Sequence, residues 1–331
     1  MSSFWNDIKK PILALAPMED VTDTSFRELV ARISDPQCLQ ILFTEFTAVD
    51  GMNHPVGKQR VSERLIVSES EREVLHEKGI KLVAQIWGNK PDVFYKVAKE
   101  ITEEYQFDGL DINMGCPVKN VVKQGSCSAL IDQPTLAQEI ILATKEATHL
   151  PVSVKTRTGI KKHDTERWIT QVLETRPAAI TLHGRTQKQQ SDGLADWDEI
   201  ARAARLRHQM APEIPFLGNG DVLSYQQACD YSARYGLDGI MIGRGIFHNP
   251  WFFNPQESEK NKDEKLEQLI LHTRLFERNW NGQKNFNILK RFYKIYTNGF
   301  RGAAAMRAEL MSANSYDDVY QIVGVHASTV V

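Results

Sequence analysis

Eight short apolar runs, spaced at a nearly constant interval, constrain the fold of this chain more than any other feature of its sequence. The runs occupy residues 12–18, 39–46, 81–88, 109–117, 151–159, 178–185, 214–221 and 239–245. Their mean step is about 32 residues, the size of one strand-plus-helix unit. Most of the gaps carry a helical pattern that opens near Ser, Thr, Asp or Pro, namely 22–32, 91–104, 134–147, 165–175 and 224–234.

The runs are apolar throughout rather than alternating, which is typical of parallel strands covered on both faces. Eight such units in about 250 residues predict a (β/α)8 TIM barrel. A doubly wound open sheet is the alternative, although it normally uses about five or six strands. The long gap at residues 47–80 predicts a loop with some extra structure at the active-site end, or a surface insertion without function.

The pattern changes after Pro250. Residues 266–279, 285–298 and 301–311 show helical spacing and no further apolar strand-like run. We therefore predict a TIM-barrel catalytic domain over residues 1–250, followed by a small C-terminal all-helical domain over residues 251–331.

Composition excludes several classes of protein. Forty Lys and Arg against 42 Asp and Glu give a net charge of -2, which excludes a protein that coats nucleic acid through bulk charge. Four cysteines in 331 residues form no disulfide scaffold and no zinc-binding spacing. We find no signal peptide and no apolar stretch of membrane-spanning length. We expect a cytoplasmic protein with no membrane partner.

Polar residues of unusual kinds gather where the runs end, and in a barrel these ends meet at the active-site face. They include Pro17, Met18, Glu19, Asp20, Thr44, Glu45, Gln85, Asn113, Cys116, Lys155, Arg157, His183, Arg185, Asn219, Asp221 and Arg244. A single polar residue at such a position usually has a structural role. Eight clusters converging on one mouth favour an active site.

The last two runs predict an anion site. They end in Gly218–Asn219–Gly220 and Gly243–Arg244–Gly245, whose glycines let backbone N–H groups approach a phosphate closely. We expect a short helix from Ile246 toward Phe253 to point its N-terminus at the same place. Tight turns alone are the alternative explanation of the glycines. The charged donor of Arg244 favours the phosphate of a cofactor.

Two further side chains point to the kind of cofactor. A cationic Lys155 beside the amide of Gln85 suits a reduced flavin, which develops negative charge on its ring. Metal binding fits worse, because the histidines lack ligand spacing. Cys116 lies in a turn between Gly115 and Pro117, which favours chemistry over a structural role. An ordinary thiol has a pKa of about 8.5, so we expect Cys116 to be mostly protonated and to donate a proton.

With these residues in hand, the chain resembles the tRNA-dihydrouridine synthases. The resemblance runs from Pro11 to about Phe253, and more faintly beyond. The segments that carry it are 14–27, 111–121, 153–159, 182–186, 218–221 and 241–245. It implies an FMN-dependent enzyme that reduces the C5=C6 bond of specific uridines in tRNA to 5,6-dihydrouridine and uses NADPH to re-reduce the flavin.

The resemblance also assigns roles to residues. The implied flavin contacts are Pro17, Met18, Gln85, Lys155 and His183, with Asn219, Gly220, Asp221, Gly243 and Arg244 on the phosphate side. Cys116 matches the catalytic cysteine, a general acid that protonates C5 after hydride from reduced FMN reaches C6. We expect Asn113 and Lys119 to hold the uracil carbonyls or the developing oxyanion, and Arg157 and Arg185 to contact RNA around the mouth.

One departure from the family pattern is visible. Where many relatives have a glycine in the loop after the cysteine, this chain reads Gly125–Ser126–Cys127–Ser128. Three interpretations are open for Cys127. It is incidental, it substitutes in part for Cys116, or it pairs with Cys116 on oxidation.

Residues 284–308 predict a local RNA-binding surface. They contain six basic residues and no acidic one, with aromatic residues between them. A helix over 285–298 would place Lys290 and Lys294 on one face with Arg291 beside them. The alternative is a solvated basic face over an aromatic core. Residues 192–197 either close over the substrate or pack, through Trp197, against the barrel.

Two other functions compete with tRNA reduction. The first is a flavin-dependent reductase of free pyrimidines or small enones, similar to the dihydroorotate and dihydropyrimidine dehydrogenases, which has no use for a basic helical tail. The second is a non-catalytic RNA-binding barrel, which we expect to lack Cys116, Lys155 or His183. We favour the tRNA enzyme and expect it to act as a monomer, with tRNA as partner and no metal.

Overall fold

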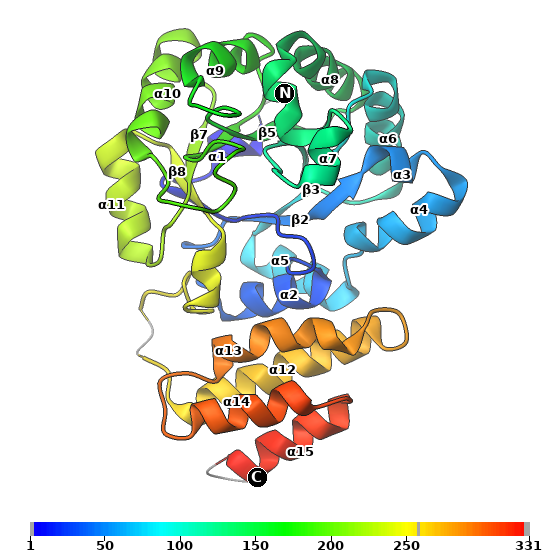
Figure 1. Cartoon of the computed structure of the whole chain (residues 1–331), viewed down its shortest axis with the longest axis vertical. Helices are drawn as coiled ribbons and strands as arrows, with labels where there is room; N and C mark the ends of the chain where they lie inside the picture. The colour runs from blue at the N-terminus through cyan, green and yellow to red at the C-terminus, as the bar shows by residue number, and fades with distance from the viewer. Residues whose placement is uncertain (1–2, 257–258, 328–331) are drawn as a thin grey trace.

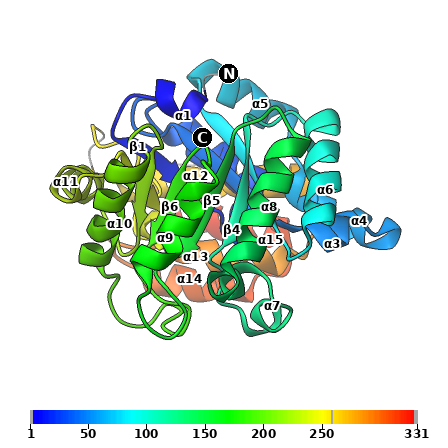
Figure 2. The same ribbon diagram turned by 90° about the horizontal axis from the view of Figure 1, so that it is seen from above.

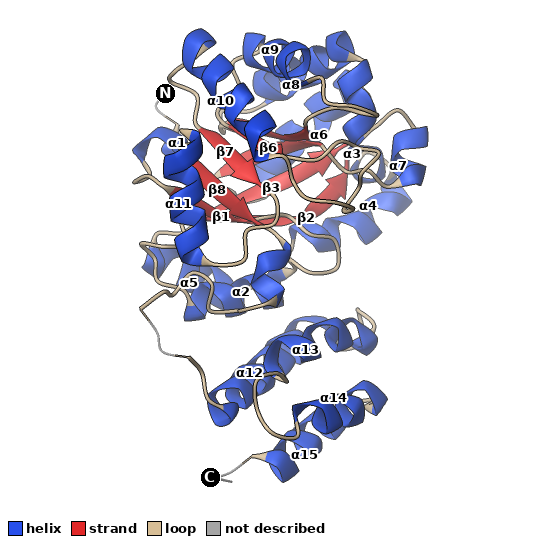
Figure 3. Ribbon diagram, turned by 60° about the vertical axis from the view of Figure 1, so that its left-hand side comes forward, coloured by secondary structure: helices blue, strands red, loops and turns tan. Residues whose placement is uncertain are grey.

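Eight parallel strands close into a barrel in chain order (Figures 1 and 3). The structure is a computed structural model, which describes residues 3–256 and 259–327. The strands are β1 (Ile12–Leu15), β2 (Ile41–Ala48), β3 (Lys81–Trp87), β4 (Gly109–Met114), β5 (Val152–Arg157), β6 (Ile180–His183), β7 (Phe216–Asn219) and β8 (Gly239–Ile242). β1 pairs with β8, so the sheet has no free edge. The predicted TIM barrel is confirmed and the open sheet is excluded.

Helices cover the outside of the barrel (Figure 2). They are α2 (Thr24–Ile33), α5 (Glu69–Lys78), α6 (Pro91–Glu104), α8 (Pro134–Ala147), α9 (Thr165–Glu174), α10 (Trp197–Met210) and α11 (Tyr225–Tyr235). Local chemistry fixes where they begin. The Asp23 side chain accepts a hydrogen bond from the Phe26 N–H and caps α2, and both α6 and α8 start on a proline.

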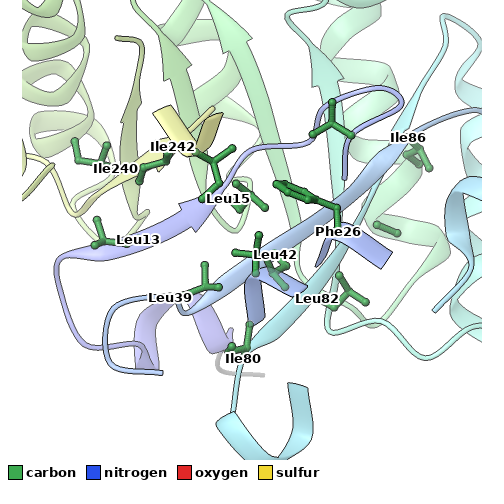
Figure 4. Packing of buried hydrophobic residues seen from close by; sticks show 14 of the residues in the cluster. Leu13, Leu15, Phe26, Leu39, Leu42, Ile80, Leu82, Ile86, Ile240 and Ile242 are labelled. Carbon is green, nitrogen blue, oxygen red and sulfur yellow. The ribbon is translucent and has the colours of Figure 1, made fainter. Parts of the chain in front are cut away.

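Two apolar layers stabilise the barrel. Outward side chains such as Leu15 and Leu42 lie beside Phe26 of α2 in one apolar cluster (Figure 4). Inward side chains fill the interior, where Trp5 of α1 (Phe4–Asp7) is fully buried and its ring centroid lies 6.4 Å from that of Phe43. α1 precedes β1, and Phe4 lies against Gly109 at the start of β4, so Trp5 plugs the amino-terminal end of the barrel.

The long gap after β2 folds into three short helices before α5. They are α3 (Val49–Met52), α4 (Pro55–Val61) and the 3-10 helix η1 (Ser62–Leu65). A buried ion pair joins α5 to α2, because Arg27 Nε donates to Glu71 Oε1 at 2.7 Å. The extra structure expected between residues 47 and 80 is therefore helical.

The chain after the barrel is helical, as predicted. Its helices are α12 (Lys262–Trp280), η4 (Phe286–Phe292), α13 (Tyr293–Tyr296), α14 (Ala303–Ser312) and α15 (Tyr316–His326). The prediction of one α-helix over 285–298 is wrong, because residues 286–292 form a 3-10 helix. Phe286, Leu289 and Phe292 recur every third residue, which suits three residues per turn. The sequence pattern also missed α15.

These helices share a core with the barrel. α12 lies beside α2 (Figure 1), and the Phe26 ring centroid lies 5.5 Å from that of His272 and 4.9 Å from that of Phe292. Such aromatic packing holds the two parts of the chain against each other. Among the described residues, no helix is long and apolar enough to cross a membrane.

Candidate active site

A cavity of about 580 Å³ opens at the carboxyl ends of the strands. This volume lies in the usual range for small-molecule sites. Its lining comprises Ala16, Pro17, Met18, Lys155, Arg157, His183, Arg185, Leu194, Asn219, Gly220, Asp221, Val222, Leu223, Met241, Gly243, Arg244, Gly245 and His248. All the side chains expected to hold a cofactor are in this list except Gln85.

Lys155 enters the cavity from β5. Its Nζ donates one long hydrogen bond to Asn219 Oδ1, at 3.4 Å. Burial, reinforced by the nearby Arg157 guanidinium, lowers the pKa of Lys155 to about 8. The Lys155 side chain is half-buried, and its ammonium stabilises an acceptor or anion placed beside it in the cavity.

His183 is neutral and has a defined tautomer. Burial, together with the surrounding cations, lowers the pKa of His183 well below its ordinary value. Its Nε2 lies 3.2 Å from Arg185 Nη1. Because a guanidinium only donates, Nε2 accepts and the ring proton is on Nδ1. His183 therefore has one N–H donor to offer a ligand.

Arg185 holds the loop that follows β6. Its side chain is only 2% exposed, and its Nη2 donates to Asp221 Oδ2 at 2.6 Å and to the Gly193 carbonyl at 2.6 Å. Burial opposes ionisation of Asp221, but the hydrogen bonds from Arg185 and the Ala195 N–H lower its pKa. Arg185, expected to contact RNA, thus makes internal contacts at the mouth.

Glycine is required at two positions of the expected phosphate side. Gly220 has a φ of 133°, and a Cβ there would lie 2.5 Å from Ala195 Cβ. A Cβ on Gly245 would lie 2.2 Å from the Val222 carbonyl oxygen. The side chain of Arg244 is 61% exposed, and its Nη2 lies 3.4 Å from Asp221 Oδ1.

The helix expected from Ile246 toward Phe253 is wrong. A single 3-10 turn, η3 (Arg244–Phe247), begins two residues earlier and ends before Pro250. Proline lacks an N–H and disfavours helical geometry at the residue before it, so the turn does not continue.

A hydrogen-bonded chain inside the barrel supports the turn that carries Cys116. Asn113 Oδ1 accepts from the Cys116 N–H at 2.9 Å, and Asn113 Nδ2 donates to Gln85 Oε1 at 2.9 Å. Gln85 Nε2 then donates to Asp111 Oδ2 at 2.7 Å. Gln85 and Asn113 therefore use their amides on neighbouring protein groups.

Asp111 was missed by the sequence analysis. Burial raises its pKa to about 6, although hydrogen bonds from Ser153 and Gln85 oppose the shift. It lies two residues before Asn113 on β4, so strand alternation places both side chains on the inner face. That parity was the signal available in the sequence.

The Cys116 thiol is more acidic than expected. A hydrogen bond from the Cys127 thiol is the largest cause that lowers the pKa of Cys116 to about 7, and the charges of Arg157 and Lys155 add to it. The thiol and thiolate forms of Cys116 are therefore both present near neutral pH, where the sequence analysis expected mostly thiol. Burial and the same contact raise the pKa of Cys127 well above its ordinary value.

Arg157 joins two loops at the mouth. Its Nε donates to the Gly115 carbonyl at 2.6 Å, next to Cys116, and its Nη1 donates to the Gln190 carbonyl at 2.8 Å in the loop after β6. Like Arg185, this guanidinium is buried and bound to protein groups. Lys119, in contrast, is exposed at the start of α7 (Lys119–Lys123).

The structure shows the packing role that was one of the two interpretations of residues 192–197. Trp197 is buried, and its ring centroid lies 4.5 Å from that of Tyr231, so it packs against the barrel helices. Leu194 in the same loop is 82% exposed and lines the cavity. The sequence analysis missed this apolar residue because a lone Leu in a polar loop gives no periodic signal.

The basic residues after the barrel divide into two groups. Lys284 and Arg291 turn toward the barrel, where Arg291 Nη1 donates to the Asp20 carbonyl at 3.0 Å. Lys290 is half-buried, with Nζ 5.9 Å from the Phe286 ring centroid, and Lys294 is exposed. The acidic residues Glu19, Asp20 and Glu45, which lie close together, are each paired with a cation.

Known proteins resemble this chain closely. The family model described as "Dihydrouridine synthase (Dus)" matches residues 14–329. A "Probable tRNA-dihydrouridine synthase" of Staphylococcus aureus (strain COL) is 41% identical over 315 residues, which are 95% of this chain and 92% of that protein.

"Probable tRNA-dihydrouridine synthase 2" of Bacillus subtilis (strain 168) is 42% identical over 319 residues, 96% of this chain and 94% of that protein. Among solved structures, a 2-naphthoyl-CoA reductase complex superposes with a TM-score of 0.56 at 9% identity, over 78% of this chain and 53% of that one. That likeness concerns the fold alone.

Proposed function

The chain belongs to the dihydrouridine synthase family, and from this premise we propose that it reduces specific uridines in tRNA to 5,6-dihydrouridine. The observation that carries the proposal is the position of Cys116. Its sulfur is within reach of the charges of Lys155 and Arg157, both of which line the cavity. An acid with a pKa of about 7 is well matched to proton transfer near neutral pH.

The residues of the cavity fit FMN. Gly220, Gly243 and Arg244 offer a phosphate close backbone approach and a cation, while Pro17 and Met18 line the cavity next to Lys155 and His183. The ammonium of Lys155 and the Nδ1–H of His183 are the donors that acceptors on the flavin ring require. Leu194 and Leu223 add apolar surface at the rim.

When bound, reduced FMN supplies hydride to uracil C6 and is recharged by NADPH. The chain itself supplies the proton, which Cys116 transfers to C5. The Asn113 side chain accepts a hydrogen bond from the Cys116 N–H and so fixes the cysteine turn. Gln85 accepts a hydrogen bond from the Asn113 amide and so orients it. We assign Lys119, exposed three residues after Cys116, to the carbonyl groups of the uracil. We propose a reaction that needs no metal ion.

The tRNA requires a surface beyond the cavity, since a uridine in folded RNA is extruded at a cost of a few kcal/mol. We propose that the helical domain, residues 251–331, provides it through Lys290 and Lys294. Arg291, expected beside them, instead donates to the Asp20 carbonyl and holds the domain on the barrel. The mouth contributes Lys161, Lys162 and Lys188, which line a second hollow with His163. We place this activity in the cytoplasm and assign it to a monomer.

The decisive experiment is mass-spectrometric mapping of dihydrouridine in unmodified tRNA treated with purified protein and NADPH. We expect dihydrouridine at one or a few positions, and a loss of at least about a hundredfold in rate for Cys116→Ala. Cys229→Ser is the matched control, because that thiol lies on α11 away from the cavity.

Reduction of free uracil or orotate at a rate equal to that of tRNA would instead support a small-molecule reductase. Truncating the helical domain is a poor way to separate the two functions, because Phe26 and Phe292 share one core.

A further inference from the structure

Cys116 and Cys127 lie on different segments that the fold holds together. Cys116 follows β4, and Cys127 begins the 3-10 helix η2 (Cys127–Asp132). Ser128 Oγ donates to the Cys116 carbonyl at 2.8 Å, and the Ser128 N–H donates to the same oxygen at 3.4 Å. Asn113 fixes the Cys116 N–H from the other side. The two thiols are therefore adjacent because their backbones are anchored.

The backbone of Cys127 is unusual. Its φ is 54°, in the left-handed region where glycine is preferred and other residues cost about 1 kcal/mol. Its side chain is fully buried, and its thiol makes a hydrogen bond to Cys116. A cysteine at a position that suits glycine thus points its sulfur at the proton donor of the proposed reaction.

The two sulfurs differ in reactivity. Cys116 is partly exposed and lies near two cations, so it has thiolate character at neutral pH. Cys127 is buried and remains protonated. Oxidation-prone cysteines are acidic, accessible thiols, and they are often placed beside a second cysteine that captures the oxidised sulfur. Both thiols are free in this structure.

We propose that Cys116 and Cys127 form a redox dithiol, in which Cys116 reacts with hydrogen peroxide and Cys127 closes a reversible disulfide. The Cys116 thiolate attacks peroxide, the O–O bond breaks, and Cys116 sulfenic acid and hydroxide form. The Cys127 sulfur then bonds to the Cys116 sulfur, the S–O bond breaks, and the oxygen leaves as water with the Cys127 proton. The dithiol loses two electrons, which reduce one peroxide, and an external thiol reductant restores it.

The disulfide removes the proton donor, so the proposed tRNA reduction stops until the pair is reduced. It also protects Cys116 from the sulfinic and sulfonic acids, which thiols do not reverse. This effect on activity rests on the proposed function. The disulfide itself does not, and peptide mapping detects it whether or not the protein makes dihydrouridine.

The test exposes full-length protein to stoichiometric hydrogen peroxide, followed by non-reducing peptide mapping and dithiothreitol treatment. We expect a cross-linked peptide pair containing Cys116 and Cys127, lighter by two hydrogens and lost on reduction. In Cys127→Gly, whose backbone suits a φ of 54°, and in Cys127→Ser, we expect irreversible oxidation of Cys116 at least about tenfold faster.

Cys229→Ser is the matched control and should leave the cross-link unchanged. Two outcomes would overturn the proposal. One is a wild-type protein whose Cys116 oxidises without forming the cross-link. The other is equal recovery of reduced Cys116 in the wild type and in both Cys127 variants.

Discussion

Lys284 Nζ lies 3.2 Å from Oε2 of Glu45 and joins the helical region to β2. Both side chains are largely buried, and Lys284 also reaches Asp23 Oδ2 at 3.4 Å and the Trp280 ring at 3.9 Å. Burial raises the pKa of Glu45, while Lys284 opposes that shift. A lysine from the most basic segment of the chain thus serves the contact between barrel and helices.

Lys284→Met should destabilise the whole chain. It leaves the carboxylates of Glu45 and Asp23 buried without their cation, which costs about 3–5 kcal/mol in the free energy of unfolding. Urea unfolding of Lys284→Met measures this loss, with the exposed Lys294→Met as control. Adding Glu45→Gln to Lys284→Met should recover part of it. A decrease of less than about 1 kcal/mol in the free energy of unfolding would mean that the Lys284–Glu45 pair contributes no more than an exposed ion pair.

Lys155→Met should weaken FMN binding by about tenfold to a hundredfold, because it removes a charged donor from the cavity. Titration of flavin-free protein, followed by quenching of FMN fluorescence, measures the affinity. Lys161→Met is the control, since that lysine is exposed outside the main cavity. Equal affinity of wild type and Lys155→Met would remove Lys155 from the flavin site.

The proposed proton transfer should slow as pH rises through about 7, the pKa of Cys116, because the protonated donor is lost. Cys127→Gly removes the hydrogen bond that lowers this pKa, so its decline should begin at higher pH. The rate of Cys116 alkylation, followed by peptide mass spectrometry across the neutral range, reports the same pKa without any activity. An unchanged alkylation profile in Cys127→Gly would contradict the thiol contact.

Lys290→Glu with Lys294→Glu should weaken tRNA binding and flatten its dependence on salt by about one to two counterions, while FMN stays bound. Arg291 is kept intact, because it donates to Asp20 and holds the helices on the barrel. A matched control is Lys9→Glu with Arg205→Glu, two exposed cations on the barrel. Equal tRNA affinity in the two double variants would place the RNA elsewhere.

Mild acid should loosen the contact between α2 and α12. Burial lowers the pKa of His272 from 6.5 to about 4. Between pH 6.5 and 4, His272 is therefore protonated in the unfolded chain but not in the folded chain. The free energy of unfolding falls as pH drops through this range, by up to about 3 kcal/mol. Urea unfolding of His272→Leu at several pH values should lack this part of the decline. The exposed His248→Leu should retain it.

The barrel was predictable because its strands are covered on both faces and therefore appear as continuous apolar runs. The cavity was predictable because each run ends in polar or glycine residues, and parallel strands bring those ends together. The orientation of individual side chains could not be predicted in this way. A bulge between Phe43 and Phe46 sets the direction of Glu45, and no local sequence pattern indicates that bulge.

The contact between Cys116 and Cys127 could not be predicted from the sequence for a similar reason. It depends on Ser128 closing the intervening loop onto the Cys116 carbonyl, a bond between residues distant in sequence. The partners of Arg157 and Arg185 were hidden in the same way. The sequence shows that an arginine follows a strand. It does not show whether backbone carbonyls of neighbouring loops already accept the hydrogen bonds of its guanidinium.

The tryptophan that seals the far end of the barrel has a consequence for the order of events. Trp5 and the inner apolar layer fill the amino-terminal end of the barrel, so ligands enter and leave the cavity at the carboxyl ends of the strands. The reductant that recharges the flavin and the nucleotide that discharges it would then compete for one approach. Under the proposed function, NADPH must dissociate before the tRNA uridine binds, and the uridine must dissociate before NADPH binds again. Reduction of the flavin and reduction of the uridine therefore alternate at one site.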